Sequence, residues 1–232
     1  MTSPEGTTEP PSNGDDSIAA ALRGFGPLGI LAILLILSGN FLFSPISAIL
    51  VLVWVQLSRT PWREIGFVRP KSWIASLAIG IAFGCVFKLF MKAIVMPMLG
   101  ADPINQAYHY LAGNTAALPG MILTLLIVAG FGEETLYRGW MFERLGKLLG
   151  AAVWARTLTV LLTSVVFGLM HYPVQGLAGA EQAIMTGLVF GTIFAVTGRI
   201  FLVMVIHAAF DLMALAIIYW DIETDVAHFI FK

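Results

Sequence analysis

Charged side chains are scarce in this sequence. Only 12% of its 232 residues are Asp, Glu, Lys or Arg, whereas 58% are hydrophobic, and the mean hydropathy is +0.87. A soluble domain has about 25% charged and about 45–50% apolar residues. So little charge cannot cover a globular surface in water, and a disordered chain needs more charge and fewer apolar residues. The composition therefore excludes both classes and predicts a protein whose solvent is lipid.

An excess of positive charge and a second cysteine are also missing. The formal net charge is -1, so we expect no nucleic-acid partner. The single cysteine, Cys85, can form no intramolecular disulfide. Residues 1–17 lack the basic segment of a signal peptide and are rich in Ser, Thr, Pro and Gly. We interpret them as a disordered N-terminal tail, followed by a single transmembrane domain over residues 18–232.

From residue 18 onward, apolar stretches are separated by short polar breaks. A membrane-spanning helix needs about 20 mainly apolar residues. Open strands cannot lie in hydrocarbon, and the alternation typical of a membrane barrel is absent. We therefore predict an all-α, polytopic transmembrane helical bundle of about seven spans, in a range of six to eight. The expected spans are two within 18–57, joined by a turn at 38–40, and then 72–99, 117–149, 153–171, 182–198 and 200–220.

Basic residues gather in alternate connections between these spans. They are Arg59, Arg63, Arg69 and Lys71 in the first connection, Arg144, Lys147 and Arg156 around the next, and Arg199 in a third. The connections 100–116 and 172–181 contain no Lys or Arg. The positive-inside rule then predicts an integral multi-pass protein with a cytoplasmic N-terminus. Lys88 and Lys92 lie toward the outer end of the span 72–99, where we expect them to snorkel to the interface, and the alternative is a role in substrate contact.

Three short clusters place polar groups within otherwise apolar spans, where each charge costs about 2.5–3.5 kcal/mol on insertion scales. The first cluster is Glu133-Glu134 followed by Arg138. Glu134 and Arg138 are four residues apart, so they share a helix face and can pair. That pairing leaves Glu133 on a different face of the helix, where its carboxyl group suits a general base. An ordinary helix end at the membrane interface would carry the same residues, so this cluster alone does not establish a site.

The other two clusters are Phe167 with His171 and His207 with Asp211. A lone His at a helix end, such as His171, is more often structural than catalytic. His207 and Asp211 share a face, so they could orient each other, share a metal, stabilise an oxyanion or only fix helix packing. Counting about 1.5 Å per residue from the basic anchors places Glu133 and the other three groups roughly 12–22 Å deep. One polar chamber within the membrane is therefore expected.

In this order, the motifs E-E-x-x-x-R, F-x-x-x-H and H-x-x-x-(N/D) resemble those of the CAAX protease and bacteriocin-processing family. These are intramembrane endopeptidases that include type II CAAX prenyl endopeptidases and bacterial relatives. The resemblance covers about 80 residues of the sequence. It implies that Glu133 and His171 activate water, and that His207 and its partner Asp211 stabilise the oxyanion. The supporting members of the motifs are Glu134, Arg138 and Phe167.

Asp211 stands where the prenyl endopeptidases tend to carry Asn. An anionic carboxylate is a poor donor to an oxyanion, so Asp211 is expected to orient His207 or to bind a metal. The departure favours the bacterial branch of the family and a bacterial plasma membrane. The candidate zinc ligands are His171, His207, Glu133 and Asp211, although no H-E-x-x-H signature occurs. The sequence thus leaves two alternatives, no cofactor or Zn²⁺, of which we favour the first.

The sequence as a whole predicts an intramembrane endopeptidase. Its expected partners are membrane lipid and a membrane-associated protein or peptide substrate, for which prenylated CAAX-type proteins are one candidate. An alternative is a non-catalytic membrane protein that serves in immunity or as a scaffold and retains the polar core. A proton- or ion-coupled carrier is a third reading, but the sequence has no internal repeat of the kind that such carriers have.

Overall fold

The computed structural model describes residues 14–42 and 44–231, in which every regular element is a helix. The elements are α1 (Gly14–Arg23), α2 (Pro27–Leu42), α3 (Ser44–Leu57), η1 (Trp62–Ile65), α4 (Trp73–Phe90), η2 (Met91–Val95), α5 (Met96–Met98), η3 (His109–Leu111), η4 (Thr115–Ala117), α6 (Leu118–Thr124), η5 (Leu125–Glu133), η6 (Thr135–Trp140), α7 (Met141–Leu149), α8 (Val153–Thr197), α9 (Ile200–Tyr219) and α10 (Glu223–Ala227). No strand occurs in these two segments. The all-α, polytopic class predicted from the sequence is confirmed.

Four helical segments of the described chain are long and apolar enough to span a bilayer. They are Trp73–Met98, Thr115–Leu149, Val153–Thr197 and Ile200–Tyr219. A fifth span arises if the residues 16–23 of α1 and the helix α2, which meet at 60°, are taken together. The apolar part of α3, Pro45–Leu57, is shorter than a span. This short helix is one reason why fewer spans are found than the seven expected.

The other reason is α8, which counts once but consists of two arms. The chain turns back at Gly176, whose backbone angles (φ 65°, ψ −161°) only glycine adopts readily. The two arms then pack against each other, because Gly168 faces Ile184 and Gly187 faces Ser164. Residues 153–197 thus provide the two antiparallel helices predicted there. The expected polar connection over 172–181 is mostly helical, and the turn is confined to Gly176.

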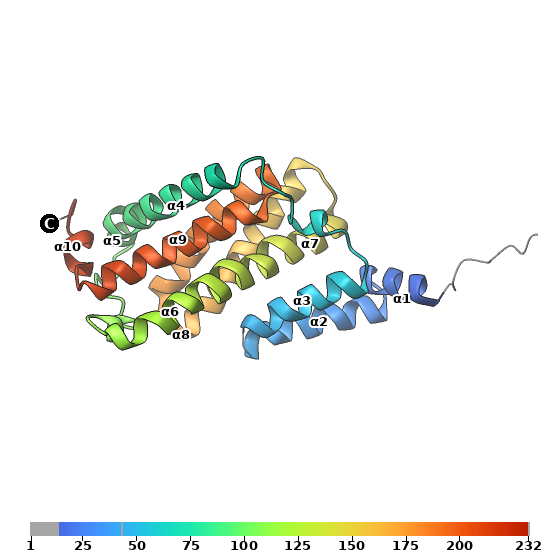
Figure 1. Ribbon diagram of the computed structural model, residues 1–232, viewed down its shortest axis with the longest axis horizontal. Coiled ribbons are helices and arrows are strands. Elements are labelled where there is room, and N and C mark those ends of the chain that lie inside the picture. The colour runs from blue at the N-terminus through green and yellow to red at the C-terminus, as the bar shows by residue number, and fades with distance from the viewer. Residues whose placement is uncertain (1–13, 43, 232) are drawn as a thin grey trace, which may run out of the picture.

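Helices α4 and α9 lie side by side along most of their length (Figure 1). A Cβ atom built on Gly84 would lie 2.4 Å from the backbone oxygen of Ile206, and one on Gly80 would lie 2.6 Å from Val205. Only glycine allows this approach, which is how small residues act in membrane helix interfaces. The contact fixes α9, which carries His207 and Asp211, against the rest of the bundle.

The N-terminal hairpin of α2 and α3 differs from the predicted one. The residues expected to form its turn, 38–40, lie inside α2, which continues to Leu42. Asn40 is buried there, and its Nδ2 donates to Tyr137 Oη at 2.9 Å. Residues 14–17, which were expected to belong to a disordered tail, are part of α1. The rest of that predicted tail, residues 1–13, lies outside the described residues.

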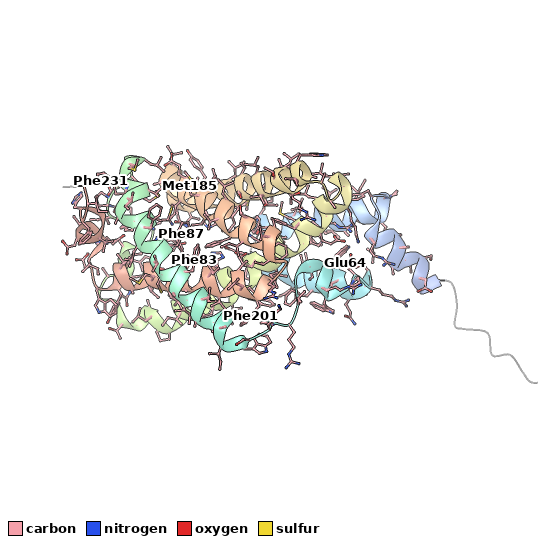
Figure 2. All side chains as sticks on the ribbon, turned by 90° about the horizontal axis from the view of Figure 1, so that it is seen from above. Glu64, Phe83, Phe87, Met185, Phe201 and Phe231 are labelled. Carbon is pink, nitrogen blue, oxygen red and sulfur yellow. The ribbon has the colours of Figure 1, made fainter. Side chains whose placement is uncertain are left out.

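The two ends of the bundle are formed by different parts of the chain. The hairpin of α2 and α3 lies near α1 at one end, whereas α5 and α10 lie at the other (Figure 1). Seen from above, Phe231 lies at the end that contains α10, Glu64 lies toward the opposite end, and Phe83 and Phe87 lie along α4 between them (Figure 2). The ring of Phe87 contacts Phe210 of α9, with centroids 5.5 Å apart. The polar side chains described next lie between α4, α8, α9 and the segment η5–η6.

Candidate active site

The acidic motif lies at the junction of two π-helical segments, η5 and η6, which meet at Glu134. Such wide turns are rare and often occur at functional sites. Gly130 allows the segment to lie close to α9, since a Cβ atom there would be 3.0 Å from that of Ala208. Beyond the junction, Thr135 Oγ1 donates to the carbonyl oxygen of Phe131 at 2.7 Å. The local winding therefore brings both glutamates to the face of the helix that meets α8 and α9.

Glu134 contacts both Arg138 and His207 at the centre of the bundle. Its Oε1 accepts a hydrogen bond from Arg138 Nη1 at 2.8 Å, as the four-residue spacing predicts. The same oxygen contacts His207 Nδ1 at 2.6 Å. The side chains of Glu134 and Arg138 are 0% and 1% exposed. A carboxylate can only accept, so Nδ1 of His207 carries the donated proton, and its Nε2 is directed to the other side of the ring.

Two phenylalanine rings enclose this ion pair. The guanidinium of Arg138 lies 4.7 Å from the ring centre of Phe167 and 5.6 Å from that of Phe190. The centroid of the Phe190 ring is also 5.3 Å from that of His207. Such contacts stabilise a buried cation. Phe167 was expected at the site from its motif, whereas Phe190 was missed, because nothing distinguishes it in the sequence from the other apolar residues of its span.

On the opposite side of its ring, His207 faces two further carboxylates. Its Nε2 lies 3.4 Å from Asp211 Oδ2 and 3.8 Å from Glu133 Oε2. Glu133 Oε2 is buried and has no hydrogen-bond partner among the described residues. A buried carboxylate oxygen without a partner is costly unless another group uses it. Of the two carboxylates that face His207 Nε2, Glu133 is therefore the one available as a proton acceptor.

His171 lies at the end of the first arm of α8, and its Nδ1 is 2.8 Å from the carbonyl oxygen of Phe167. A carbonyl only accepts, so Nδ1 is the donor and carries a proton. In the neutral ring, Nε2 is then the basic nitrogen. The backbone thus fixes which nitrogen of His171 can accept a proton or bind water.

Glu133, His171, His207 and Asp211 line one cavity of about 270 Å³. Three separate helical segments, η5, α8 and α9, contribute these four side chains. Tyr108, from the connection before α6, lines the same cavity. Burial raises the pKa of Tyr108 above 10, and the charges of Asp211 and Glu133 act in the same direction. Its phenol is therefore neutral at physiological pH.

The expected zinc ligands do not form a metal site in the part of the chain that the structure describes. No group of three or more His, Cys, Asp or Glu side chains there could hold a metal ion. The inward ring nitrogen of His207 is engaged by Glu134, and one nitrogen of His171 by a carbonyl. In each histidine these contacts leave Nε2 free, so they are compatible with either alternative, and the choice between no cofactor and Zn²⁺ stays a prediction.

Lys88 and Lys92 were expected to snorkel to the interface, and this expectation is wrong. Both residues are buried, with 6% and 8% of their surface exposed. Lys88 Nζ donates to Gln182 Oε1 at 2.9 Å, and Lys92 Nζ is 3.1 Å from Glu223 Oε1. Both lysines point into the bundle, because α8 and α10 offer polar partners there.

Residues 115–213 match a family model described as Type II CAAX prenyl endopeptidase Rce1-like. This segment of the chain is similar to that family. The match includes all three motifs, from Glu133 to Asp211. Neither a curated protein nor a solved structure matches the chain.

The Rce1-like family is a protease family, and the similarity supports a protease. Its apolar helices make it an integral membrane protein. The Rce1-like segment contains η5, η6, α8 and most of α9, which carry the cavity-lining acids and histidines. Helices α1–α4 lie outside the match and pack around it.

Proposed function

We propose that this Rce1-like protein is an intramembrane endopeptidase that hydrolyses a peptide bond in a membrane-associated protein or peptide. The observation that carries the proposal is the convergence of Glu133, His171, His207 and Asp211 on one cavity within the bundle. Peptide hydrolysis needs a base for water and a donor for the developing oxyanion. The cavity offers one candidate for each role.

In the proposed reaction, Glu133 Oε2 takes a proton from water as the water oxygen attacks the carbonyl carbon of the scissile bond. The negative charge that develops on the carbonyl oxygen is stabilised by a hydrogen bond from the Nε2–H of a doubly protonated His207, whose Nδ1–H is donated to Glu134 and whose positive charge the three surrounding carboxylates favour. Glu133 then transfers its proton to the nitrogen of the leaving group as the C–N bond breaks. The products are one carboxylic acid and one amine, so the water is fully consumed.

His171 and Asp211 have positioning roles in this proposal. Nε2 of His171 accepts a hydrogen bond from the attacking water and so holds it beside Glu133. Asp211 Oδ2, 3.4 Å from His207 Nε2, keeps the imidazole ring directed at the substrate. Glu134 fixes the same ring from its other side. The imidazole is thus held from two sides, as preorganised catalysis requires.

A lipid-bearing substrate is supported by a second cavity, of about 900 Å³. It lies on the neighbouring face of α9, where Ala208 and Leu212 line it while His207 and Asp211 line the catalytic cavity. Most of its other lining residues are apolar, as an acyl or prenyl chain requires. Helices α9 and η5 line both cavities, each with a different set of residues. We propose a prenylated, CAAX-type peptide as the substrate to test first.

The basic residues support a cytoplasmic N-terminus, and a bacterial plasma membrane stays a prediction from the motif departure at Asp211. Lys147 at the end of α7 pairs with Glu64 of η1 at 3.2 Å, so two of the basic connections meet at one end of the bundle. The proposed partners of the protein are its substrate and the surrounding lipid. It assigns no role to a metal ion.

The decisive experiment measures cleavage of an internally quenched, farnesylated peptide by the purified protein in nanodiscs. We expect Glu133→Gln to reduce kcat by about 10²–10⁴-fold, because it removes the proton acceptor. The matched control is Glu181→Gln, which changes an acid of α8 that does not line the catalytic cavity. An unchanged rate for Glu133→Gln contradicts the proposal.

A further inference from the structure

Lys88 is a buried lysine that forms no ion pair with any described carboxylate. Only 6% of its surface is exposed, and its Nζ donates to the neutral amide oxygen of Gln182 at 2.9 Å. The same Nζ lies 4.8 Å from the ring centre of Phe210. Among residues 14–42 and 44–231, no carboxylate oxygen lies within 4.0 Å of this nitrogen. An amide and an aromatic face compensate a full charge only in part.

Lys92 lies one turn further along the chain, in η2, which continues α4. Its contacts show how this protein compensates the charge of a buried lysine. Its Nζ is 3.1 Å from Glu223 Oε1 and also donates to the carbonyl oxygen of Pro103. Glu223 in turn accepts from the backbone N–H of Asn105 at 2.9 Å. Lys92 therefore has a structural role that ties α10 to the connection after α5. No comparable contact explains Lys88.

Lys88 lies where two cavities adjoin. It lines the catalytic cavity together with Glu133 and His207, and it also lines an adjoining cavity of about 250 Å³. The two cavities share further polar residues, Asn105, Gln175 and Gln182. Lys88 therefore lies where a peptide that extends from the scissile bond would pass from one cavity into the other.

We propose that Lys88 and Gln182 form a subsite that binds a carboxylate of the substrate. The inference rests on the proposed peptidase function and deepens it, because it makes a negative charge close to the scissile bond a requirement for good substrates. A carboxylate supplies the counter-ion that Lys88 lacks, and charge-assisted hydrogen bonds of this kind are about twice as strong as neutral ones. The carboxylate belongs either to a free C-terminus or to an acidic side chain.

Three farnesylated, internally quenched peptides distinguish these sources. The first has a free C-terminal carboxylate, the second ends in a C-terminal amide, and the third is the amide peptide with glutamate as its last residue. They are assayed with the wild type and with Lys88→Met, which keeps the length of the side chain but removes its charge. Lys88→Arg tests rescue by a cation, and Lys71→Met is the control for loss of an exposed lysine.

For the wild type and for Lys71→Met, we expect kcat/KM for the carboxylate peptide to exceed that for the amide peptide by about tenfold or more. In Lys88→Met this ratio falls to about one, and Lys88→Arg restores part of it. Cleavage of the glutamate peptide at the rate of the carboxylate peptide assigns the subsite to a side chain. Cleavage at the rate of the amide peptide assigns it to the C-terminus.

The subsite is overturned if the wild type treats all three peptides alike or if Lys88→Met keeps the tenfold ratio. Binding of the same peptides to Glu133→Gln, with and without Lys88→Met, is measured by fluorescence anisotropy. This second measurement separates the two proposals, since a charge-dependent Kd without cleavage by the wild type supports the subsite and contradicts the peptidase. Equal binding of charged and uncharged peptides contradicts the subsite even where cleavage occurs.

Discussion

Glu134 and His207 are 73 residues apart in the sequence, yet Oε1 of the glutamate lies 2.6 Å from Nδ1 of the histidine at the centre of the bundle. The same oxygen accepts from Arg138. One carboxylate therefore holds together the π-helical segment and α9, the two elements that carry the proposed base and the proposed oxyanion donor. Stability and catalytic geometry depend on the same side chain.

Glu134→Ala should lower the free energy of unfolding strongly. It leaves the guanidinium of Arg138 buried without a partner, and breaking a buried pair in this way costs about 3–5 kcal/mol. Unfolding in mixed detergent, followed by circular dichroism, measures the change. The control is Glu64→Ala, whose ion pair with Lys147 is partly exposed and should contribute less than about 1 kcal/mol. Similar losses for the two variants would show that the central pair is not structural.

His171→Gln should reduce kcat with little change in KM. The proposed role of its Nε2 is to hold water in the transition state, and such groups contribute about 10²–10⁴-fold. Steady-state cleavage of the farnesylated peptide gives both constants. His228→Gln, at an exposed position outside the match to the family, should leave them unchanged. A rise in KM at constant kcat would instead assign His171 to substrate binding.

Asp211→Asn and Asp211→Ala should differ in their effect. If Asp211 only orients His207, the amide retains most of the contact at 3.4 Å, and the rate falls by less than about tenfold. The alanine variant removes the contact and should lose about 10–100-fold. Single-turnover cleavage rates compare the two. Equal losses would mean that the negative charge itself, and not the orientation of the ring, is required.

Gly84→Ala should destabilise the packing of α4 against α9. The added methyl group would lie 2.4 Å from the backbone oxygen of Ile206, so the helices must separate. Overpacking of this kind costs about 1–3 kcal/mol. The control is Gly146→Ala, where an added methyl group has nothing within 4 Å. A loss in Tm confined to Gly84→Ala, measured in detergent, would confirm the close crossing.

Removal of divalent metals should leave the cleavage rate unchanged. The described histidines and carboxylates do not form a group that could hold a metal ion. Overnight dialysis against EDTA, followed by the peptide assay, tests this, and elemental analysis of the purified protein gives the zinc content. One zinc per chain, with activity lost on chelation and restored by zinc, would require a metal-dependent mechanism.

The sequence predicted the class of fold and the four acids and histidines that line the cavity, because charges within apolar spans have few reasons to be there. The pairing of Glu134 with Arg138 followed from their spacing alone. The contact between Glu134 and His207 could not be predicted, since it joins two helices whose rotation depends on packing. Phe190 could not be predicted either, because aromatic residues are common in apolar spans and nothing in the sequence distinguishes this one.

The largest error concerned polar residues interpreted from their position along the chain. Asn40 was placed in a turn because it follows Ser38 and Gly39, yet it lies inside α2 and donates to Tyr137. Lys88 and Lys92 were placed at the interface because they lie near the end of a span. In both cases a partner far away in the sequence determines where the side chain points, and no local pattern contains that information.

The turn at Gly176 also limits how this protein can vary in length. It joins the two arms of α8 without spare residues, and the arms are matched turn by turn through Gly168, Gly187 and their partners. One inserted residue in either arm would rotate everything beyond it by about 100° about the helix axis, turning His171 or Gln182 away from the cavity. Insertions and deletions among relatives should therefore avoid α8 and accumulate in the connection over residues 100–116.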